Sequence, residues 1–282
     1  MIKPMLAHKF SEDRINFKKD TIYMQPKLDG VRCLFTKDGA FSRTGKQFMN
    51  VKHIEEDLKH LFEACPWIAL DGELYNHDLK DDFEKIISLV RKQKPTDEDR
   101  SEARRLTQYH VYDYTSQPPN LIHGLKYKHR LDNLTCSNIY TPSIHYVKTT
   151  RVKSFKAAKD FHKRILEKGY EGSILRTNTL YKNGRSFGLM KFKDFSDTEA
   201  TIVGYEVGKG KRSGTLGKFV MQDDNGIQFG CPPGKGYTYK DLADILNNIN
   251  DYIGKRATFT YFERTKYGSY RHPHYKCIRN YE

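Results

Sequence analysis

The chain has few cysteines and no long apolar run. Its 282 residues include five cysteines that are widely scattered and form no CxxC pair: Cys33, Cys65, Cys136, Cys231 and Cys277. This pattern is typical of a reducing compartment and offers no spacing for a structural zinc site. No stretch approaches the roughly 18 to 20 apolar residues of a membrane helix, and the start, MIKPMLAHKF, lacks the apolar core of a secretory signal. We therefore expect a soluble protein of the cytoplasm with no membrane partner.

The chain instead carries a large excess of basic residues. Lysine and arginine number 49 against 35 aspartates and glutamates, which gives a net charge of +14 and a pI near 9.4. Residues 1–193 hold 36 basic and 24 acidic residues, whereas residues 194–282 hold 13 and 11. Basic proteins gain binding energy by releasing counterions from phosphates. The composition therefore favours a polyanionic partner, with most of the contact in the first part.

The periodicity of apolar residues predicts helices and strands that do not alternate regularly, so an α+β fold is expected. Recurrence at three and four residues predicts helices over 51–64, 81–92, 154–169 and 239–254. Runs rich in β-branched and aromatic residues predict strands over 30–35, 109–114, 172–176, 199–207, 218–222 and 256–263.

The composition changes near residue 193. Beyond it come alternating strands, the Gly- and Lys-rich stretch GKGKRSGTLG and one helix. About five strands with a single helix in roughly ninety residues are typical of an OB-fold β-barrel. We therefore predict two domains, residues 1–193 and residues 194–282, with an OB barrel as the second.

One short stretch, Lys27-x-Asp29-Gly30-x-Arg32, places two cations, a carboxylate and a glycine within six residues. Alone it is a weak signal. It is followed in order by SRTGK (42–46), DGE (71–73), YDY (112–114), EGSILR (171–176), LMKFK (189–193) and YRHPHYKCIR (270–279). This series resembles the ATP-dependent DNA ligases, especially the minimal viral and bacterial forms. The resemblance implies a nucleotidyltransferase (adenylation) domain of antiparallel sheets and helices over 1–193 and an OB-fold domain over 194–282.

The resemblance implies that Lys27 attacks the α-phosphate of ATP and forms a lysyl-AMP intermediate. A free lysine has a pKa of about 10.4, so its neighbours must favour the neutral amine. Nearby cations do so, and we expect Lys191, Lys193 and a bound Mg²⁺ (or Mn²⁺) to act in this way and to stabilise charge on the phosphate. Glu171 matches the metal-binding carboxylate of the family. Asp29 matches the residue that helps orient the attacking 3′-hydroxyl.

Further residues are expected around the nucleotide. By the same resemblance Glu73 accepts a hydrogen bond from the ribose, and Asp71 and Gly72 shape a turn. Tyr112 would stack on adenine, although an aromatic strand residue taken alone is more often part of a core. Gln25 stands where the family reads the adenine edge.

Three arginines complete the expected ATP site. Arg176 ends the motif that begins at residue 171. The last motif is the short, proline-containing form of small viral ligases, and in the family it orients the outgoing pyrophosphate. Arg271 is slightly favoured over Arg279 for this role, and both stay open.

Nucleic-acid contacts are expected from two regions. The resemblance assigns Arg32 to the 5′-phosphate of a nick and Arg43 to the strand that carries the 3′-hydroxyl, and the guanidinium fork suits phosphate. The Gly-rich stretch around residues 207–218 is expected either to contact the DNA backbone or to be a solvated basic turn. Its cations are Lys209, Lys211 and Arg212.

The leading hypothesis is a monomeric ATP-dependent DNA ligase that seals 5′-phosphate/3′-hydroxyl nicks in duplex DNA through lysyl-AMP and DNA-adenylate. An mRNA capping guanylyltransferase or an RNA ligase of the same superfamily is the alternative, and labelling by ATP or GTP separates the first from a ligase. A non-catalytic basic protein with an OB domain is a third class. The presence of Lys27, Glu73, Glu171 and Lys191 together argues against it.

Overall fold

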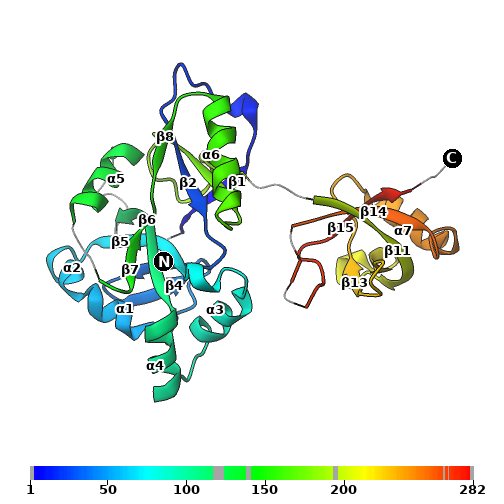
Figure 1. The fold of residues 1–282 in the computed structure, drawn as a ribbon, viewed down its shortest axis with the longest axis horizontal. Helices are drawn as coiled ribbons and strands as arrows, with labels where there is room; N and C mark the ends of the chain where they lie inside the picture. The colour runs from blue at the N-terminus through cyan, green and yellow to red at the C-terminus, as the bar shows by residue number, and fades with distance from the viewer. Residues whose placement is uncertain are drawn as a thin grey trace. The chain divides into compact units, whose positions relative to one another are not determined.

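The computed structural model describes residues 3–116, 124–137, 141–192, 196–262, 264–265 and 267–279. The chain forms two compact units, Met1–Lys193 and Asp194–Glu282. Both mix helices with largely antiparallel sheets, so the predicted α+β class is confirmed (Figure 1). Lys193, which we expected near the nucleophile, lies outside the described residues. Among the residues that are described, no helix is long and apolar enough to cross a membrane.

The first sheet of unit 1 consists of β3 (Val31–Thr36), β4 (Gly39–Ser42), β5 (Ile68–Tyr75), β6 (Gln108–Ser116) and β7 (Ile144–Tyr146). Its strand order is β4-β3-β5-β6-β7, and β6 and β7 are its parallel pair. The pairing of β3 with β5 sets Arg32 opposite Glu73. Two motifs that are far apart in the sequence thus meet on adjacent strands.

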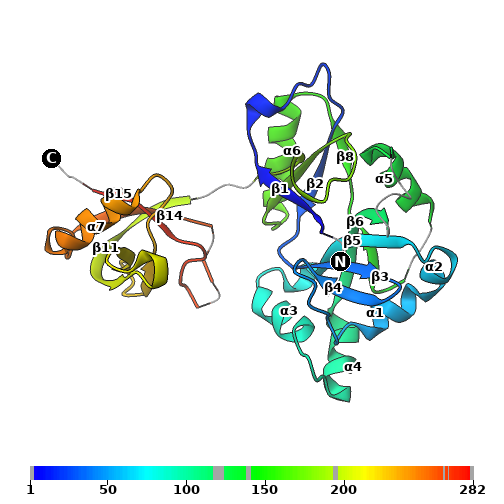
Figure 2. The same ribbon diagram turned by 180° about the vertical axis from the view of Figure 1, so that it is seen from behind.

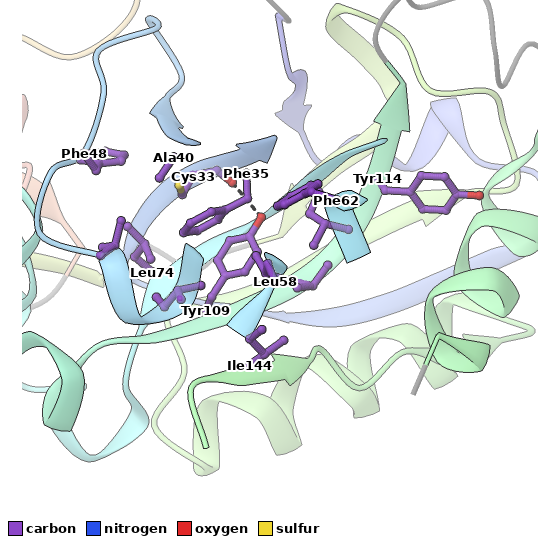
Figure 3. Packing of buried hydrophobic residues seen from close by; sticks show 14 of the residues in the cluster. Cys33, Phe35, Ala40, Phe48, Leu58, Phe62, Leu74, Tyr109, Tyr114 and Ile144 are labelled. Carbon is purple, nitrogen blue, oxygen red and sulfur yellow. Dashed lines mark hydrogen bonds between the residues drawn. The ribbon is translucent and has the colours of Figure 1, made fainter. Parts of the chain in front are cut away.

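A buried apolar cluster covers one face of this sheet (Figure 3). The predicted helix over 51–64 is two helices, α1 (Lys52–Asp57) and α2 (Lys59–Ala64), joined at the fully buried Leu58. Phe35 and Phe62 belong to this cluster with Leu58. The hydroxyl of Tyr109 donates to the carbonyl of Cys33 over 3.1 Å, which satisfies its polar atom inside the core (Figure 3).

Three further helices follow: α3 (Phe83–Val90) packs on this sheet, α4 (Asp97–Leu106) packs on α3, and α5 (Tyr127–Cys136) packs on β6. The first was predicted, and Asp82 caps it by accepting from the backbone N–H of Lys85. The second begins with a capping box between Thr96 and Asp99. Helices α4 and α5 were not predicted, because α4 is strongly polar and α5 has only a weakly apolar stripe.

The second sheet of unit 1 consists of β1 (Met5–Lys9), β2 (Ile22–Lys27), β8 (Thr150–Val152), β9 (Gly172–Thr177) and β10 (Gly184–Phe192). The order is β1-β10-β9-β2-β8, with β1 and β10 parallel. Helix α6 (Phe155–Glu167), as predicted, lies along this sheet (Figure 2). Its apolar side chains, among them Ala158, Phe161 and Ile165, share a core with Met24 of β2.

Unit 2 contains one sheet and helix α7 (Tyr239–Asn247). Its strands are β11 (Ser196–Val207), β12 (Leu216–Gln222), β13 (Gln228–Cys231), β14 (Arg256–Tyr261) and β15 (His274–Ile278), in the order β13-β12-β11-β14-β15. The two outer strands approach through Tyr275, whose N–H donates to the carbonyl of Pro232 over 2.9 Å. In the described residues, unit 2 is therefore a curled five-stranded sheet and not the fully closed barrel that was predicted. Its two edges meet through this hydrogen bond.

Candidate active site

The register of three strands gathers the first motif residues. In the pairing of β2 with β9, Lys27 is opposite Gly172, and Ile174 stands between Gln25 of β2 and Lys191 of β10. Lys27 forms an ion pair with the carboxylate of Glu171, and their side chains are 22% and 6% exposed. A buried carboxylate beside the amine stabilises the ammonium form. The nucleophile expected from the sequence is therefore held by the carboxylate expected to bind metal.

Two motif glycines are required by close backbone approach. A Cβ atom added at Gly30 would lie 2.3 Å from the carbonyl oxygen of Leu74. At Gly72 it would lie 2.5 Å from the carbonyl oxygen of His110. Side chains at these positions would push β5 away from its neighbours, so the glycines let the strands that carry the site come together.

These strands surround a pocket of about 640 Å³. Within the described residues, Glu73 is the single carboxylate of its lining, and Tyr112 and Ile174 contribute apolar surface. Eight cations line the pocket: Lys27, Arg32, Arg43, Lys46, Arg91, Arg176, Arg185 and Lys191. The excess of positive charge suits a phosphorylated ligand, and the volume lies in the range of small-molecule sites.

Glu73 and Tyr112 meet within this pocket. The Tyr112 hydroxyl lies 3.4 Å from Glu73 Oε2, at the limit of a hydrogen bond. Burial raises the pKa of Glu73 to about 7, an effect that Lys27 and Arg32 oppose and that Asp71 strengthens. Tyr112 is half-buried and lines the pocket, so it is more than a core residue.

Arg32 is held by a fixed carboxylate. Its Nε and Nη2 donate to the two oxygens of Asp71 over 2.9 and 2.6 Å, and the Tyr181 hydroxyl donates to the same carboxylate over 2.7 Å. Burial alone would lower the pKa of Arg32, but the charge of Asp71 raises it well above its ordinary value. The expectation that Asp71 and Gly72 shape a turn was wrong. Both lie inside β5, where Asp71 orients Arg32.

A second buried network stands behind the pocket. Asp113 accepts from Arg130 Nε over 2.7 Å and from Arg176 Nη1 over 2.7 Å, and Arg176 Nε donates to Gln25 Oε1 over 2.8 Å. The Gln25 amide in turn donates to Tyr127 and to a threonine. Because both amide hydrogens are used, this geometry favours a role for Gln25 in positioning Arg176 over contact with adenine.

Three residues of these networks were missed as site residues: Asp113, Arg130 and Tyr181. Their signals in the sequence were slight. Asp113 stands within the YDY motif, but Arg130 and Tyr181 belong to no motif that we singled out. Asp113 and Arg130 are almost fully buried, and charged groups are rarely buried without a partner. Tyr181 is partly buried.

Arg43 lies in the turn that follows β4. The turn is closed by hydrogen bonds from the Ser42 N–H to the Lys46 carbonyl over 2.8 Å and from the Gly45 N–H to the Ser42 carbonyl over 2.9 Å. Arg43 and Lys46 are exposed and line the same pocket as Lys27. The structure therefore brings Arg43 to the pocket that also holds Arg32.

Unit 2 carries the remaining predicted residues. In the turn between β11 and β12 three cations are exposed: Lys209, Lys211 and Arg212. Arg271 has its guanidinium 5.9 Å from the ring centre of Phe262, and Arg279 Nε lies 2.7 Å from an oxygen of Glu199. These positions are described within unit 2 only.

The fold and the site define a class of protein. A strand lysine paired with a glutamate, a pocket rich in cations and a second unit built on a curled sheet are the parts of a covalent nucleotidyltransferase with an OB-like domain. The family model described as ATP dependent DNA ligase domain matches residues 4–193, and that of the DNA ligase OB-like domain matches residues 207–279. The chain belongs to the ATP-dependent DNA ligase family.

Known relatives agree with this assignment. The DNA ligase of African swine fever virus is 28% identical over 283 residues, which covers 93% of this chain and 65% of the viral protein. The chain thus spans about two thirds of the length of that relative. A solved structure of a Lig E DNA ligase superposes with a TM-score of 0.78 at 23% identity, covering 99% of this chain and 100% of the other. The Chlorella virus DNA ligase-adenylate gives 0.51 at 25% identity, covering 100% and 99%.

Proposed function

We propose that this protein is an ATP-dependent DNA ligase that seals 5′-phosphate/3′-hydroxyl nicks in duplex DNA. The observation that carries the proposal is Lys27, which lines a strongly cationic pocket with Glu73, Tyr112 and Lys191 and is paired with Glu171. Membership of the ligase family supports it. The matched family model and the viral relative are both named as DNA ligases, which favours this function over a capping or RNA ligase activity.

In the first step the Lys27 amine attacks the α-phosphorus of ATP. A nitrogen–phosphorus bond forms as the bond from phosphorus to the oxygen of pyrophosphate breaks, and pyrophosphate leaves. The amine must first lose the proton that its pairing with Glu171 stabilises. Lys191, on strand β10 of the same sheet as Lys27, stabilises negative charge that develops on the phosphate.

ATP and a divalent cation suit the residues present. The pocket volume and its partly buried lysines, Lys27 and Lys191, suit a nucleotide phosphate. Tyr112 and Ile174 offer apolar surface for the base, and Glu73 is placed to accept from the ribose. Glu171 supplies the hard carboxylate oxygens that Mg²⁺ or Mn²⁺ prefers. When bound, such a cation neutralises phosphate charge.

The later steps need the nick. We assign the 5′-phosphate to Arg32, which lines the pocket and uses Nε and Nη2 on Asp71. Asp29 orients the 3′-hydroxyl, and Arg43 contacts the strand that carries it. In unit 2, pyrophosphate orientation by Arg271 or Arg279 and backbone contacts by the basic turn stay predictions. The cytoplasmic location and the monomeric state also stay predictions.

The proposal is tested by labelling and sealing together. The protein is mixed with Mg²⁺ and either α-labelled ATP or α-labelled GTP, and then with a nicked duplex. We expect a covalent adduct from ATP and sealing of a DNA nick. Lys27→Ala should abolish the adduct and still seal a pre-adenylylated nick in part, whereas Lys163→Ala on an exposed face of α6 should behave as wild type. An adduct in Lys27→Ala, or label from GTP alone, would refute the assignment.

A further inference from the structure

Two segments line the exposed side of the pocket, and only one of them belongs to a ligase motif. One part is the turn after β4, with Arg43 and Lys46, and the other is the end of α3, with Arg91 and Gln93. We call this set the outer wall. All four residues line the pocket, and only the turn belongs to a motif found in the sequence.

The two parts of the outer wall are fastened together. Gln93 Nε2 donates to the carbonyl of Gln47 over 3.3 Å. The buried Asn50 Nδ2 donates to the carbonyl of Leu89 in α3 over 2.9 Å. These bonds join the segment after the turn to Leu89 in α3 and to Gln93, three residues beyond the end of the helix. The end of α3, where Arg91 stands, is therefore fixed to the segment that follows the turn of Arg43.

Arg91 differs from the nearest lysines on either side of it in the sequence, Lys85 and Lys92. Lys85 pairs with Glu102 at 2.6 Å, and Lys92 pairs with Asp99. Arg91 is exposed, and in the described part of the chain no carboxylate pairs with it. Lysines on either side of it in sequence thus have acidic partners, whereas the residue that lines the pocket does not.

The exposure of the outer wall indicates which anion it meets. Lys27, Glu73 and Tyr112 are partly buried, as suits a nucleotide enclosed by the pocket, whereas Arg43 and Arg91 are exposed at its mouth. Exposed arginines that are free to fork onto phosphate are typical of contacts to a nucleic-acid backbone. The half-buried ring of Phe83, at the start of α3, adds an apolar surface to the same wall.

We propose that the end of α3 is a second binding element for the nicked strand, in which Arg91 contacts the sugar–phosphate backbone of the strand that ends in the 3′-hydroxyl. It acts beside Arg43 on that strand because the two share one wall. This inference rests on the proposed ligase function and deepens it. It assigns a nucleic-acid contact to a residue outside the ligase motifs of this chain.

The first test measures how salt affects binding of a dye-labelled nicked duplex that ends in a 3′-dideoxynucleotide. Arg91→Ala should reduce the slope of log affinity against log salt by about 0.9, so its binding defect should be about three to four times larger at 50 mM than at 200 mM salt. Arg91→Lys should keep the slope. Arg105→Ala removes an exposed arginine of α4 outside the pocket and should behave as wild type.

Labelling by ATP without DNA serves as the second readout. Arg91→Ala should form the adduct as fast as wild type, and loss of adduct formation would move Arg91 to the ATP phosphates and overturn the proposal. An unchanged salt slope would also overturn it, even if the wild type seals nicks. If the wild type binds nicks through Arg91 but seals none, the outer wall stands and the ligase function fails.

Neutral methylphosphonate links decide which strand is contacted. They are placed near the nick in the 3′-hydroxyl strand of one duplex and in the 5′-phosphate strand of another. On the first duplex Arg91→Ala should cost no further affinity, and on the second it should cost as much as on unmodified DNA. An equal cost on both duplexes, or suppression on the second alone, would overturn the strand assignment.

Discussion

The inner and outer arginines of the pocket differ in their partners. Arg32 and Arg176 are 18% and 4% exposed, and each is bonded to a carboxylate that is itself almost fully buried. Arg43 and Arg91 are exposed, and no described carboxylate pairs with them. The same side chain is therefore part of the fold at one depth, whereas at another it is exposed and is proposed to bind phosphate.

This difference teaches where mutations should act. Removing one partner of a buried ion pair leaves an uncompensated charge and costs about 3 to 5 kcal/mol, whereas exposed charges contribute little to stability. Inner arginine networks should therefore control folding and positioning. Outer arginines should control binding of the nucleic acid and leave the free energy of unfolding nearly unchanged.

The largest effect is expected from Asp113→Ala. It leaves Arg130 and Arg176 buried without their shared carboxylate, so the free energy of unfolding of unit 1 should fall by about 3 to 5 kcal/mol. The single tryptophan, Trp67, lies in unit 1, so its fluorescence during urea unfolding reports on that unit.

Asp132→Ala is the matched control for this change. It removes an exposed carboxylate that pairs with Lys128 one helical turn away, so the loss should be about 0.5 kcal/mol or less. A small loss from Asp113→Ala as well would mean that the buried network does not differ from a surface pair.

The next largest effect is expected from Arg32→Ala on sealing. A lost hydrogen-bonded charge contact costs about 1.5 to 3 kcal/mol, so sealing should fall about 10- to 100-fold while adduct formation with ATP changes little. The variant also leaves Asp71 buried beside Tyr181 without its cation. Gel assays of adduct and sealed product measure the two steps separately.

The double variant Arg32→Ala/Asp71→Asn separates the two causes, because it removes the unpaired charge. If the nick phosphate is the partner of Arg32, sealing stays low in the double variant. Recovery of sealing would place the defect in the stranded carboxylate of Asp71, and equal loss of both steps would place Arg32 in the ATP site.

A third prediction concerns the pH dependence of stability through Glu73. Its pKa in the fold, about 7, lies above the ordinary value of 4.5, so the fold favours the protonated acid. The resulting stability is present below pH 4.5 and is lost as the pH rises through 7. Relative to Glu73→Gln, wild type should therefore lose about 1 to 3 kcal/mol between pH 4.5 and pH 8.

Urea unfolding at both pH values, followed by Trp67, checks this. Glu63→Gln alters an exposed carboxylate of α2 and should track the wild type at each pH. A constant difference between wild type and Glu73→Gln across the range would show that the pKa of Glu73 is the same in the folded and unfolded states.

The sequence was informative where chemistry fixes the residue type. Lys27, Glu73, Glu171 and Lys191 were identified because their motifs occur in a defined order, and the structure brings Lys27, Glu73 and Lys191 to one pocket and pairs Glu171 with Lys27. Amphipathic helices such as α6 were predicted because their apolar residues recur at three and four positions. Polar α4 was not, because its capping box and its packing on α3 rather than an apolar stripe establish it.

The supporting residues could not be predicted, because strand register decides their partners. Tyr181 bonds Asp71 across 110 residues, and Arg176 bonds Asp113 across 63. Asp71 was wrongly assigned to a turn because the short stretch DGE is locally typical of a turn. Pairing with β3 and β6 instead keeps Asp71 in strand β5. Burial of these groups is a property of the assembled sheets.

The smallest change in stability is expected from Arg43→Ala on the outer wall. Its exposed side chain has no described carboxylate partner, so the free energy of unfolding should shift by no more than about 0.5 kcal/mol. Nick binding should nevertheless weaken, with the salt slope reduced by about 0.9 for one lost phosphate contact. Since Arg43 and Arg91 are proposed to meet separate phosphates, Arg43→Ala/Arg91→Ala should reduce the slope by about 1.8. A double variant no worse than either single one would mean that both arginines serve one phosphate, and the outer wall would then be a single contact.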